Sequence, residues 1–377
     1  MAWTKTVDGS IVDQDGKIIF FSTRRFIDDI CVGNCCFICG AKPEEKSFND
    51  EHVFPEWLLR RYNLFARTLK LPNGITTRYD RHTVPCCTDC NSLMGKVVEE
   101  RISSAIDGSP ESIQNFLANG GDLELFVWLG LIYLKLHLKN KMNRKELDRR
   151  IPSGMIADDY EWDLLHHIHT VVRCFYVPTT VEANVFGSIM VLPCRQEGST
   201  DQFDFFDSHL GQTMMLRLGS TAIFVVFDDS TAASGFFQVN MLDKITGPIN
   251  ELQAREIMTD FALLNMHLKE RPIYRSELDM LSETHKVVAT LPDQPELEQW
   301  NYELRGLLLW RAFEHAWPQL RFAGTTKEEV EQSVLTGKLT VLFDDGGKFA
   351  GGPGFLRDEV TAGLSDTSLS VLLCEGS

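Results

Sequence analysis

The sequence contains no uninterrupted apolar run of about 18 residues, which is the length that a membrane-spanning helix requires. Its most apolar stretch, Leu123 to Leu138, is interrupted by Glu124, Lys135 and His137, so it predicts a buried helix. The first five residues, Met1 to Lys5, lack the apolar core of a signal peptide. We therefore expect a cytoplasmic protein that makes no membrane contact.

The sequence also lacks an excess of positive charge. Its net charge of −16 argues at first against a nucleic-acid partner. However, residues 1–103 hold 14 basic and 14 acidic side chains, whereas the remainder holds 23 basic and 39 acidic ones. The acidity therefore lies wholly outside the first quarter of the chain, and that quarter is neutral.

Cysteine is not scarce, and its placement is informative. The chain has ten cysteines, most of them near one another, which favours a reducing compartment over a disulfide framework. Two Cys-x-x-Cys pairs, Cys36/Cys39 and Cys87/Cys90, are separated by 47 residues. This spacing is typical of a tetrahedral zinc site, and four thiolates would make it a closed, structural one. Three further cysteines stay alternatives as ligands, although only the chosen set has matched spacing: Cys31, Cys35 and Cys86.

Other polar residues stand at fixed places around these pairs. Glu51 and His52 lie between the two pairs, and Asn91 directly follows the last cysteine. This order resembles the zinc-bearing HNH (ββα-metal) endonucleases, including phage Holliday-junction resolvases, over residues 30–103. The resemblance implies a ββα module, to which we assign residues 1–106. A helix from Asn91 to about Ile102 would be its α element.

The resemblance also implies roles for individual residues. His52 would be the general base that activates water, and Glu51 and Asn91 would bind a catalytic Mg²⁺ or Mn²⁺. The middle asparagine of the HNH pattern falls here on His82, which departs from the family. A histidine at this position is compatible with orienting the base, with binding the metal, or with an impaired site. Glutamate also replaces the commoner aspartate at position 51.

A basic segment lies inside the module. Phosphate contacts drive nonspecific affinity for DNA, so we predict that these side chains form the nucleic-acid-binding surface. An ordinary solvated face is the alternative interpretation, and for Lys96, which lies one turn past Asn91, it is the favoured one. The predicted contacts are Arg60, Arg61, Arg67, Lys70, Arg78, Arg81 and Lys96.

The rest of the chain predicts an acidic α+β companion domain over residues 107–377, with an antiparallel sheet and flanking helices. Expected helices span about 111–120, 122–141, 157–173, 252–269 and 295–316, with another from 327. Expected strands span 185–192, 202–206, 213–218, 222–227, 236–239 and 339–343, in addition to 18–21 near the N-terminus. The tail after Asp358 shows no pattern, and we expect disorder near the C-terminus.

The leading hypothesis is a metal-dependent HNH endonuclease that hydrolyses phosphodiester bonds in DNA, with RNA as the alternative substrate. By analogy with bacterial anti-phage effectors, its C-terminal domain would regulate it, and a homodimer or a partner complex would form through that domain. The competing hypothesis is a non-catalytic zinc-knuckle module that binds nucleic acid or protein. A second metal site at His166, His167 and His169 is less favoured than simple packing, because Asp163 lies nearby in the sequence but nothing else there completes a ligand set.

Overall fold

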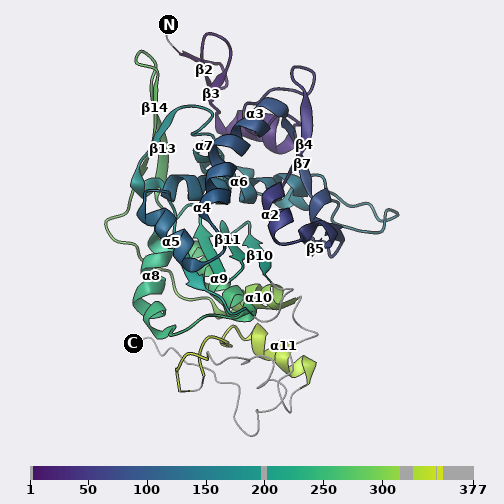
Figure 1. Cartoon of the computed structure of the whole chain (residues 1–377), viewed down its shortest axis with the longest axis vertical. Helices are drawn as coiled ribbons and strands as arrows, with labels where there is room; N and C mark the ends of the chain where they lie inside the picture. Colours follow the sequence, from purple (N-terminus) through teal and green to yellow (C-terminus); the bar gives the residue numbers. More distant parts are fainter. Residues whose placement is uncertain (1–2, 197–201, 315–325, 345, 351–377) are drawn as a thin grey trace. The chain divides into compact units, whose positions relative to one another are not determined.

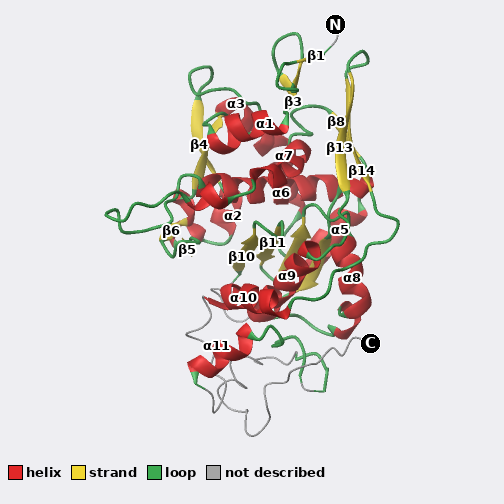
Figure 2. Ribbon diagram, turned by 180° about the vertical axis from the view of Figure 1, so that it is seen from behind, coloured by secondary structure: helices red, strands yellow, loops and turns green. Residues whose placement is uncertain are grey.

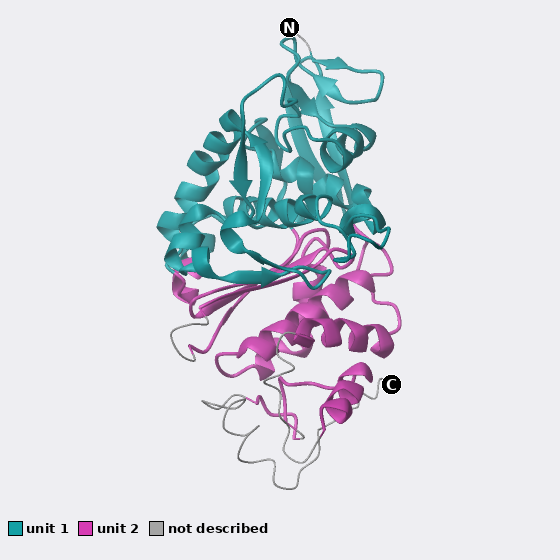
Figure 3. Ribbon diagram, turned by 90° about the vertical axis from the view of Figure 1, so that its right-hand side faces the viewer, with its two compact units in different colours: residues 1–107, 115–186, 273–290 teal, residues 108–114, 187–272, 291–377 magenta. Residues whose placement is uncertain are grey.

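The computed structural model describes residues 3–196, 202–314, 326–344 and 346–350. Within these residues the chain is a mixed α+β protein with several small sheets, as predicted (Figures 1 and 2). It divides into two compact units (Figure 3). Among the described residues, every helix is too short or too polar to cross a bilayer.

Unit 1 comprises Met1–Asp107, Asn115–Phe186 and Ile273–Thr290. Its strands are β1 (Thr4–Lys5), β2 (Ile11–Val12), β3 (Ile18–Phe20), β4 (Phe48–His52), β5 (Thr68–Lys70), β6 (Thr76–Arg78), β7 (Thr83–Cys87), β8 (Thr179–Val181), β13 (Ile273–Asp279) and β14 (Thr284–Thr290). Its helices and helical turns are α1 (Thr23–Arg25), η1 (Phe26–Val32), α2 (Glu56–Arg61), η2 (Leu64–Ala66), η3 (Tyr79–Arg81), α3 (Thr88–Met94), η4 (Gly95–Glu99), α4 (Glu100–Ala105), α6 (Asp122–Asn140), η5 (Ile156–Asp159), η6 (Trp162–Leu165), α7 (His166–Val172) and η7 (Ala183–Val185).

A hairpin followed by a helix forms the part of unit 1 that contains the cysteine motifs. Strands β4 and β7 pair antiparallel, with Phe48 opposite Cys87 and His52 opposite Thr83. Helix α3 begins directly after β7 and continues through η4 and α4, so the chain is helical from Thr88 to Ala105. The predicted helix from Asn91 to Ile102 is therefore confirmed. Between β4 and β7 the chain inserts α2 and the β5–β6 hairpin.

Helix α6 lies inside unit 1 and is buried along nearly its whole length. It packs against α7, β7 and η4. A helix that is apolar on every side needs neighbours on every side, and this explains its central place. The polar side chains that it carries into this interior therefore need partners there.

Unit 2 comprises Gly108–Gln114, Gly187–Pro272 and Leu291–Ser377, so helix α5 (Pro110–Ala118) is divided between the units. Its antiparallel sheet has the order β10-β11-β12-β9, which confirms the predicted antiparallel sheet. These strands are β9 (Ile189–Pro193), β10 (Phe203–Ser208), β11 (Thr213–Leu218) and β12 (Thr221–Val226). The helices are α8 (Ala232–Asn240), η8 (Leu242–Lys244), α9 (Glu251–Met266), α10 (Tyr302–Phe313) and α11 (Lys327–Leu335).

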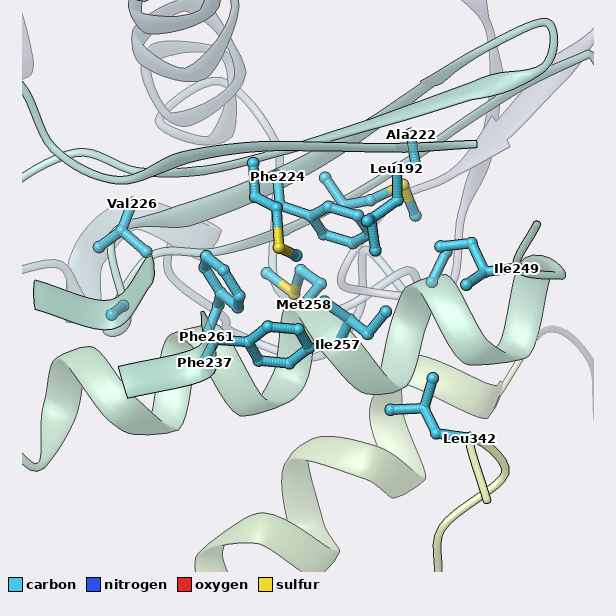
Figure 4. Close-up of a cluster of buried hydrophobic side chains, with 14 of the residues drawn as sticks. Leu192, Ala222, Phe224, Val226, Phe237, Ile249, Ile257, Met258, Phe261 and Leu342 are labelled. Atoms are coloured by element: carbon cyan, nitrogen blue, oxygen red, sulfur yellow. The ribbon is translucent and has the colours of Figure 1, made fainter. Parts of the chain in front are cut away.

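Helix α9 packs on this sheet and on α8 and α10. Phe224 from the sheet, Phe237 from α8 and Phe261 from α9 meet in a buried cluster (Figure 4). The Phe237 and Phe261 rings lie 5.2 Å apart. The apolar side chains of three elements thus close one core within unit 2.

Several sequence-based assignments differ from the structure. The predicted strand 236–239 is wrong, because it lies inside helix α8. Asp229 explains the helix: its Oδ2 accepts a hydrogen bond from the Ala233 amide at 2.7 Å and satisfies a first-turn donor. The predicted helix 157–173 is broken into η5, η6 and α7. In place of a strand, the segment 339–343 has isolated bridge residues at Leu339 and Phe343, and Phe343 pairs with Phe349. The predicted disorder after Asp358 lies outside the described residues.

The sequence predicts that the zinc module ends at residue 106, and this boundary stays a prediction. The compact unit that holds the cysteines is larger than that module, since it also contains residues 115–186 and 273–290. The hairpin β13–β14, which the sequence analysis missed, pairs with β8 in unit 1.

Candidate metal centre

The four predicted cysteines come together. Four Sγ atoms all lie within 4.8 Å of one another, and their residues are buried: Cys36, Cys39, Cys87 and Cys90. The Sγ atoms of Cys39 and Cys87 are 3.6 Å apart. Tetrahedral zinc with Zn–S bonds of about 2.3 Å would separate its sulfurs by about 3.8 Å. The group can therefore bind a metal ion, and it fits a structural zinc.

Backbone turns aim the sulfurs at one point. In the first pair the Gly40 amide donates to the Cys36 carbonyl at 2.8 Å, and Gly40 has a φ of +77°. A Cβ at Gly40 would lie 2.7 Å from atoms of Ile18 and Phe21, so only glycine fits this turn. In the second pair Cys87 ends β7 and Cys90 lies in the first turn of α3.

A fifth cysteine borders the group. The Cys86 Sγ lies 3.8 Å from the Cys36 Sγ, and Cys86 is also buried. Contact with Cys36 raises the pKa of both Cys86 and Cys90 well above the usual thiol range. A bound cation would relieve this crowding by favouring thiolates. Cys86 thus remains an alternative ligand by distance, while Cys31 and Cys35 lie outside the group of four.

Residues from beyond position 106 hold the first turn in place. On α7, the His169 Nε2 donates to the Phe37 carbonyl at 2.9 Å. Arg173 follows α7, and its Nε donates to the Ile38 carbonyl at 2.5 Å. Both carbonyls belong to the residues between Cys36 and Cys39. Burial lowers the pKa of His169 well below its usual value, so the ring is neutral and donates through one nitrogen. The sequence analysis named His169 only in a possible second metal site, and it missed Arg173.

The predicted catalytic residues occupy different surroundings. Glu51 and His52 end strand β4, and their side chains lie on opposite faces of the hairpin because a strand alternates. Glu51 shares its face with Val84, which is opposite it on β7 and is buried. The His52 side chain is partly exposed. Asn91 contacts β4 through Asn49, with its Nδ2 3.2 Å from the Asn49 Oδ1.

Glu51 already has a cationic partner. The Lys135 Nζ of α6 lies 2.7 Å from the Glu51 Oε1 and 2.7 Å from the His52 carbonyl oxygen. Burial opposes the charge of Lys135, but Glu51 and Glu99 outweigh this effect and raise the pKa of the ammonium. The residues present therefore do not fit a divalent ion at Glu51 in this arrangement. The interruption of the apolar run by Lys135 was the only sequence signal of this contact.

His82 is a core residue. It is 1% exposed, and its backbone carbonyl accepts a hydrogen bond from the Val53 amide at 2.9 Å, which extends the hairpin. Burial, aided by Lys139, lowers the pKa of its ring to about 3. The ring is therefore neutral at ordinary pH. Of the three possibilities that the sequence left open, orientation of His52 is the one for which the structure provides a contact, because the His82 backbone holds Val53, the residue after His52.

The side chains predicted to contact nucleic acid are mostly exposed, but several already have partners within the protein. Arg60 pairs with Glu56, and Arg78 pairs with Asp80. The Arg61 guanidinium donates to the Ser103 carbonyl at 2.9 Å. All the predicted contacts except Lys96 lie in the insertion between β4 and β7, and Lys96 lies on η4. Those that are exposed are Arg60, Arg61, Lys70, Arg78, Arg81 and Lys96.

The histidines of α7 pack in the interior of unit 1. The His166 Nε2 lies 2.8 Å from the Phe21 carbonyl, and the His167 ring stacks on Tyr274 with centroids 3.7 Å apart. Together with the contact of His169 to the cysteine turn, these interactions account for all three side chains by packing and hydrogen bonding.

Comparison with known proteins adds no relative. No family model, curated protein or solved structure matches this chain. The likeness to HNH endonucleases therefore rests on the residues alone.

Proposed function

We propose that this protein is an endonuclease of the HNH type that hydrolyses phosphodiester bonds, with DNA as its substrate. The observation that supports the proposal is the combination of the four-cysteine group with a β4–β7 hairpin and helix α3. A zinc ion bound there would join the turn at Cys36 to the start of α3. Glu51 and His52 on β4 and Asn91 on α3 then belong to one rigid unit.

The chemistry would centre on His52. As general base, its imidazole would take a proton from water while the oxygen attacks phosphorus. The bond from phosphorus to the 3′ oxygen would break and that oxygen would take a proton from solvent, which leaves a 5′-phosphate and a 3′-hydroxyl. His52 is partly exposed, so solvent reaches it. The family resemblance implies Mg²⁺ or Mn²⁺ at Glu51, but that carboxylate is held by Lys135, and we draw no step through the ion.

The exposed basic side chains of the insertion would contact the phosphate backbone. Such contacts carry no base information, so we expect binding without strong sequence preference and with a steep dependence on salt. The acidic remainder of the chain would restrain or regulate the module and form the homodimer or partner contact. A role in defence against phage is part of this proposal by analogy alone.

Nicking of supercoiled plasmid tests the proposal. The full-length protein and His52→Ala are compared in Mg²⁺, Mn²⁺ and EDTA, with bound zinc measured in both. We expect nicking by the wild type that falls at least about 100-fold in His52→Ala, since general-base catalysis contributes that much. Unchanged zinc content in the variant excludes unfolding as the cause. Absence of nicking by the wild type in every buffer would contradict an endonuclease.

A second candidate function is a non-catalytic zinc module that binds nucleic acid or protein. The ion pair between Glu51 and Lys135 favours it, because the carboxylate then has a structural role. The same plasmid experiment separates the two, since a binding module retards the plasmid on a gel or leaves it unaffected, and cuts it in no buffer.

A further inference from the structure

Lys135 occupies an unusual position for a lysine. Its side chain is 3% exposed, and that of its partner Glu51 is 15% exposed. The ammonium lies at hydrogen-bond distance from both the Glu51 carboxylate and the His52 carbonyl. It therefore touches the two residues to which the proposed reaction assigns the metal and the base. No part of the HNH resemblance includes this lysine, which lies outside residues 30–103.

A second carboxylate, that of Glu99, interacts electrostatically with the same ammonium. Glu99 is half-buried on η4, and burial raises its pKa while Lys135 counteracts that rise. Glu51 also acts on Glu99 as a like charge. Two acids that repel each other are thus held near one buried cation. If the ammonium were removed, these acids would offer oxygen ligands of the kind that Mg²⁺ and Mn²⁺ prefer.

We propose that Lys135 is an intramolecular competitor that keeps a divalent cation from the Glu51 carboxylate. The proposal rests on the proposed function for the role of Glu51. A divalent ion would need to lie about 2.0–2.2 Å from an oxygen of this carboxylate. With the ammonium in place, two positive charges would be close together in a poorly hydrated interior, where their repulsion exceeds its value in water. Divalent binding at Glu51 therefore requires the displacement of Lys135.

An ordinary structural ion pair is the alternative explanation, and the two differ in a measurable way. A structural pair stabilises the fold and has no connection with metal affinity. A competitor suppresses a metal site that appears when its charge is removed. Methionine is close to lysine in length and carries no charge, so Lys135→Met tests the charge while it conserves the shape of the side chain.

Mn²⁺ binding to the full-length, zinc-loaded protein tests the proposal, with free Mn²⁺ measured by electron paramagnetic resonance. Wild type and Glu51→Gln should bind Mn²⁺ equally. In the wild type the Glu51 carboxylate is paired with Lys135, and in the variant the carboxylate is absent. Lys135→Met should gain one site at least about tenfold tighter than any wild-type site, given the loss of a neighbouring charge. The double variant Lys135→Met/Glu51→Gln should lose that site, and it serves as the control for weak binding to the acidic surface.

Two results would overturn the proposal. One is equal Mn²⁺ affinity of the wild type and of folded Lys135→Met. The other is a wild-type Mn²⁺ site that Glu51→Gln abolishes, and this comparison needs no lysine variant if Lys135→Met fails to fold. Plasmid nicking is measured separately. Absence of nicking by both the wild type and folded Lys135→Met, with the expected Mn²⁺ pattern, would reject the nuclease and keep the competition, whereas nicking with equal Mn²⁺ affinity of the two proteins would reject only the competition.

Discussion

Arg173 holds the carbonyl of Ile38 with its Nε at 2.5 Å, although the two residues are 135 positions apart in the chain. Its Nη2 also donates to the Ile18 carbonyl at 2.6 Å. One guanidinium thus joins the cysteine turn to the N-terminal strand β3. Lys141, also from beyond residue 106, donates to the Ile30 carbonyl at 2.6 Å. The cysteine module is therefore completed by residues that a fragment ending at 106 would lack.

Loss of the Arg173 guanidinium should loosen the cysteine turn. We expect Arg173→Met to reduce the free energy of unfolding by about 3 kcal/mol, since several charge-assisted hydrogen bonds to buried carbonyls are lost. Zinc release to a chelator should also become faster. Urea unfolding and a colorimetric zinc assay measure the two effects. Arg24→Met is the control, because the Arg24 side chain is 82% exposed. Zinc release at the wild-type rate would show that Arg173 does not support the turn.

The cysteine group predicts a graded response to serine substitution. Cys90→Ser should lose zinc and most of the stability of unit 1, because a structural zinc contributes folding free energy directly. Cys35→Ser should retain one zinc per chain. Cys86→Ser decides the role of the neighbouring sulfur, and we expect it to retain zinc as well. Elemental analysis and thermal unfolding give both quantities. Zinc loss in Cys86→Ser with retention in Cys90→Ser would exchange the ligand assignments.

His82 should make the protein less stable in acid. Its pKa is about 3 in the folded chain, compared with 6.5 for an unperturbed histidine, so between these values the unfolded chain binds the proton and the folded chain does not. Stability from this residue is therefore complete above about pH 6.5 and decreases as the pH falls toward 3. The loss between about pH 7.5 and pH 5 is about 2 kcal/mol.

The matched variant for this prediction is His82→Asn, which cannot titrate and has the residue of the HNH pattern. Urea unfolding of both proteins at the two pH values gives the difference between their pH slopes. That difference isolates His82 from the other buried histidines and from the cysteines. Identical slopes would mean that the His82 ring protonates in the folded state as readily as in the unfolded one.

Arg305 should be essential to the core of unit 2. Its Nε lies 2.6 Å from the Asp260 Oδ1 and its Nη2 lies 2.9 Å from the Glu256 Oε1, all within the interior. Arg305→Met would leave two buried carboxylates without their cation, at a cost of about 3–5 kcal/mol. Arg275→Met, on the surface of β13, should change stability by less than about 0.5 kcal/mol. Chemical unfolding followed by circular dichroism measures both, and similar values for the two variants would contradict the prediction.

The failed strand prediction shows where local sequence is insufficient. The segment 236–239 contains Phe236, Phe237 and Val239, which suit a strand by their residue types. Asp229 decides otherwise, since it binds amides at the start of α8 and also the Ser188 amide at 2.7 Å. Ser188 and Asp229 are 41 positions apart in the chain. A window of a few residues contains no record of such a contact.

The sequence by itself determined the four-cysteine group, because two pairs of identical spacing suit one metal ion although they are far apart in the chain. It also determined the helix after Cys90 and the mixed α+β class, because hydrophobic periodicity acts over short distances along the chain. Only the tertiary structure decided the surroundings of Glu51 and His82. Strand alternation and the central place of α6 turn Glu51 toward Lys135, a contact across 84 positions. Burial is a property of the assembled fold, and it is burial that makes one histidine neutral and gives one lysine a carboxylate partner.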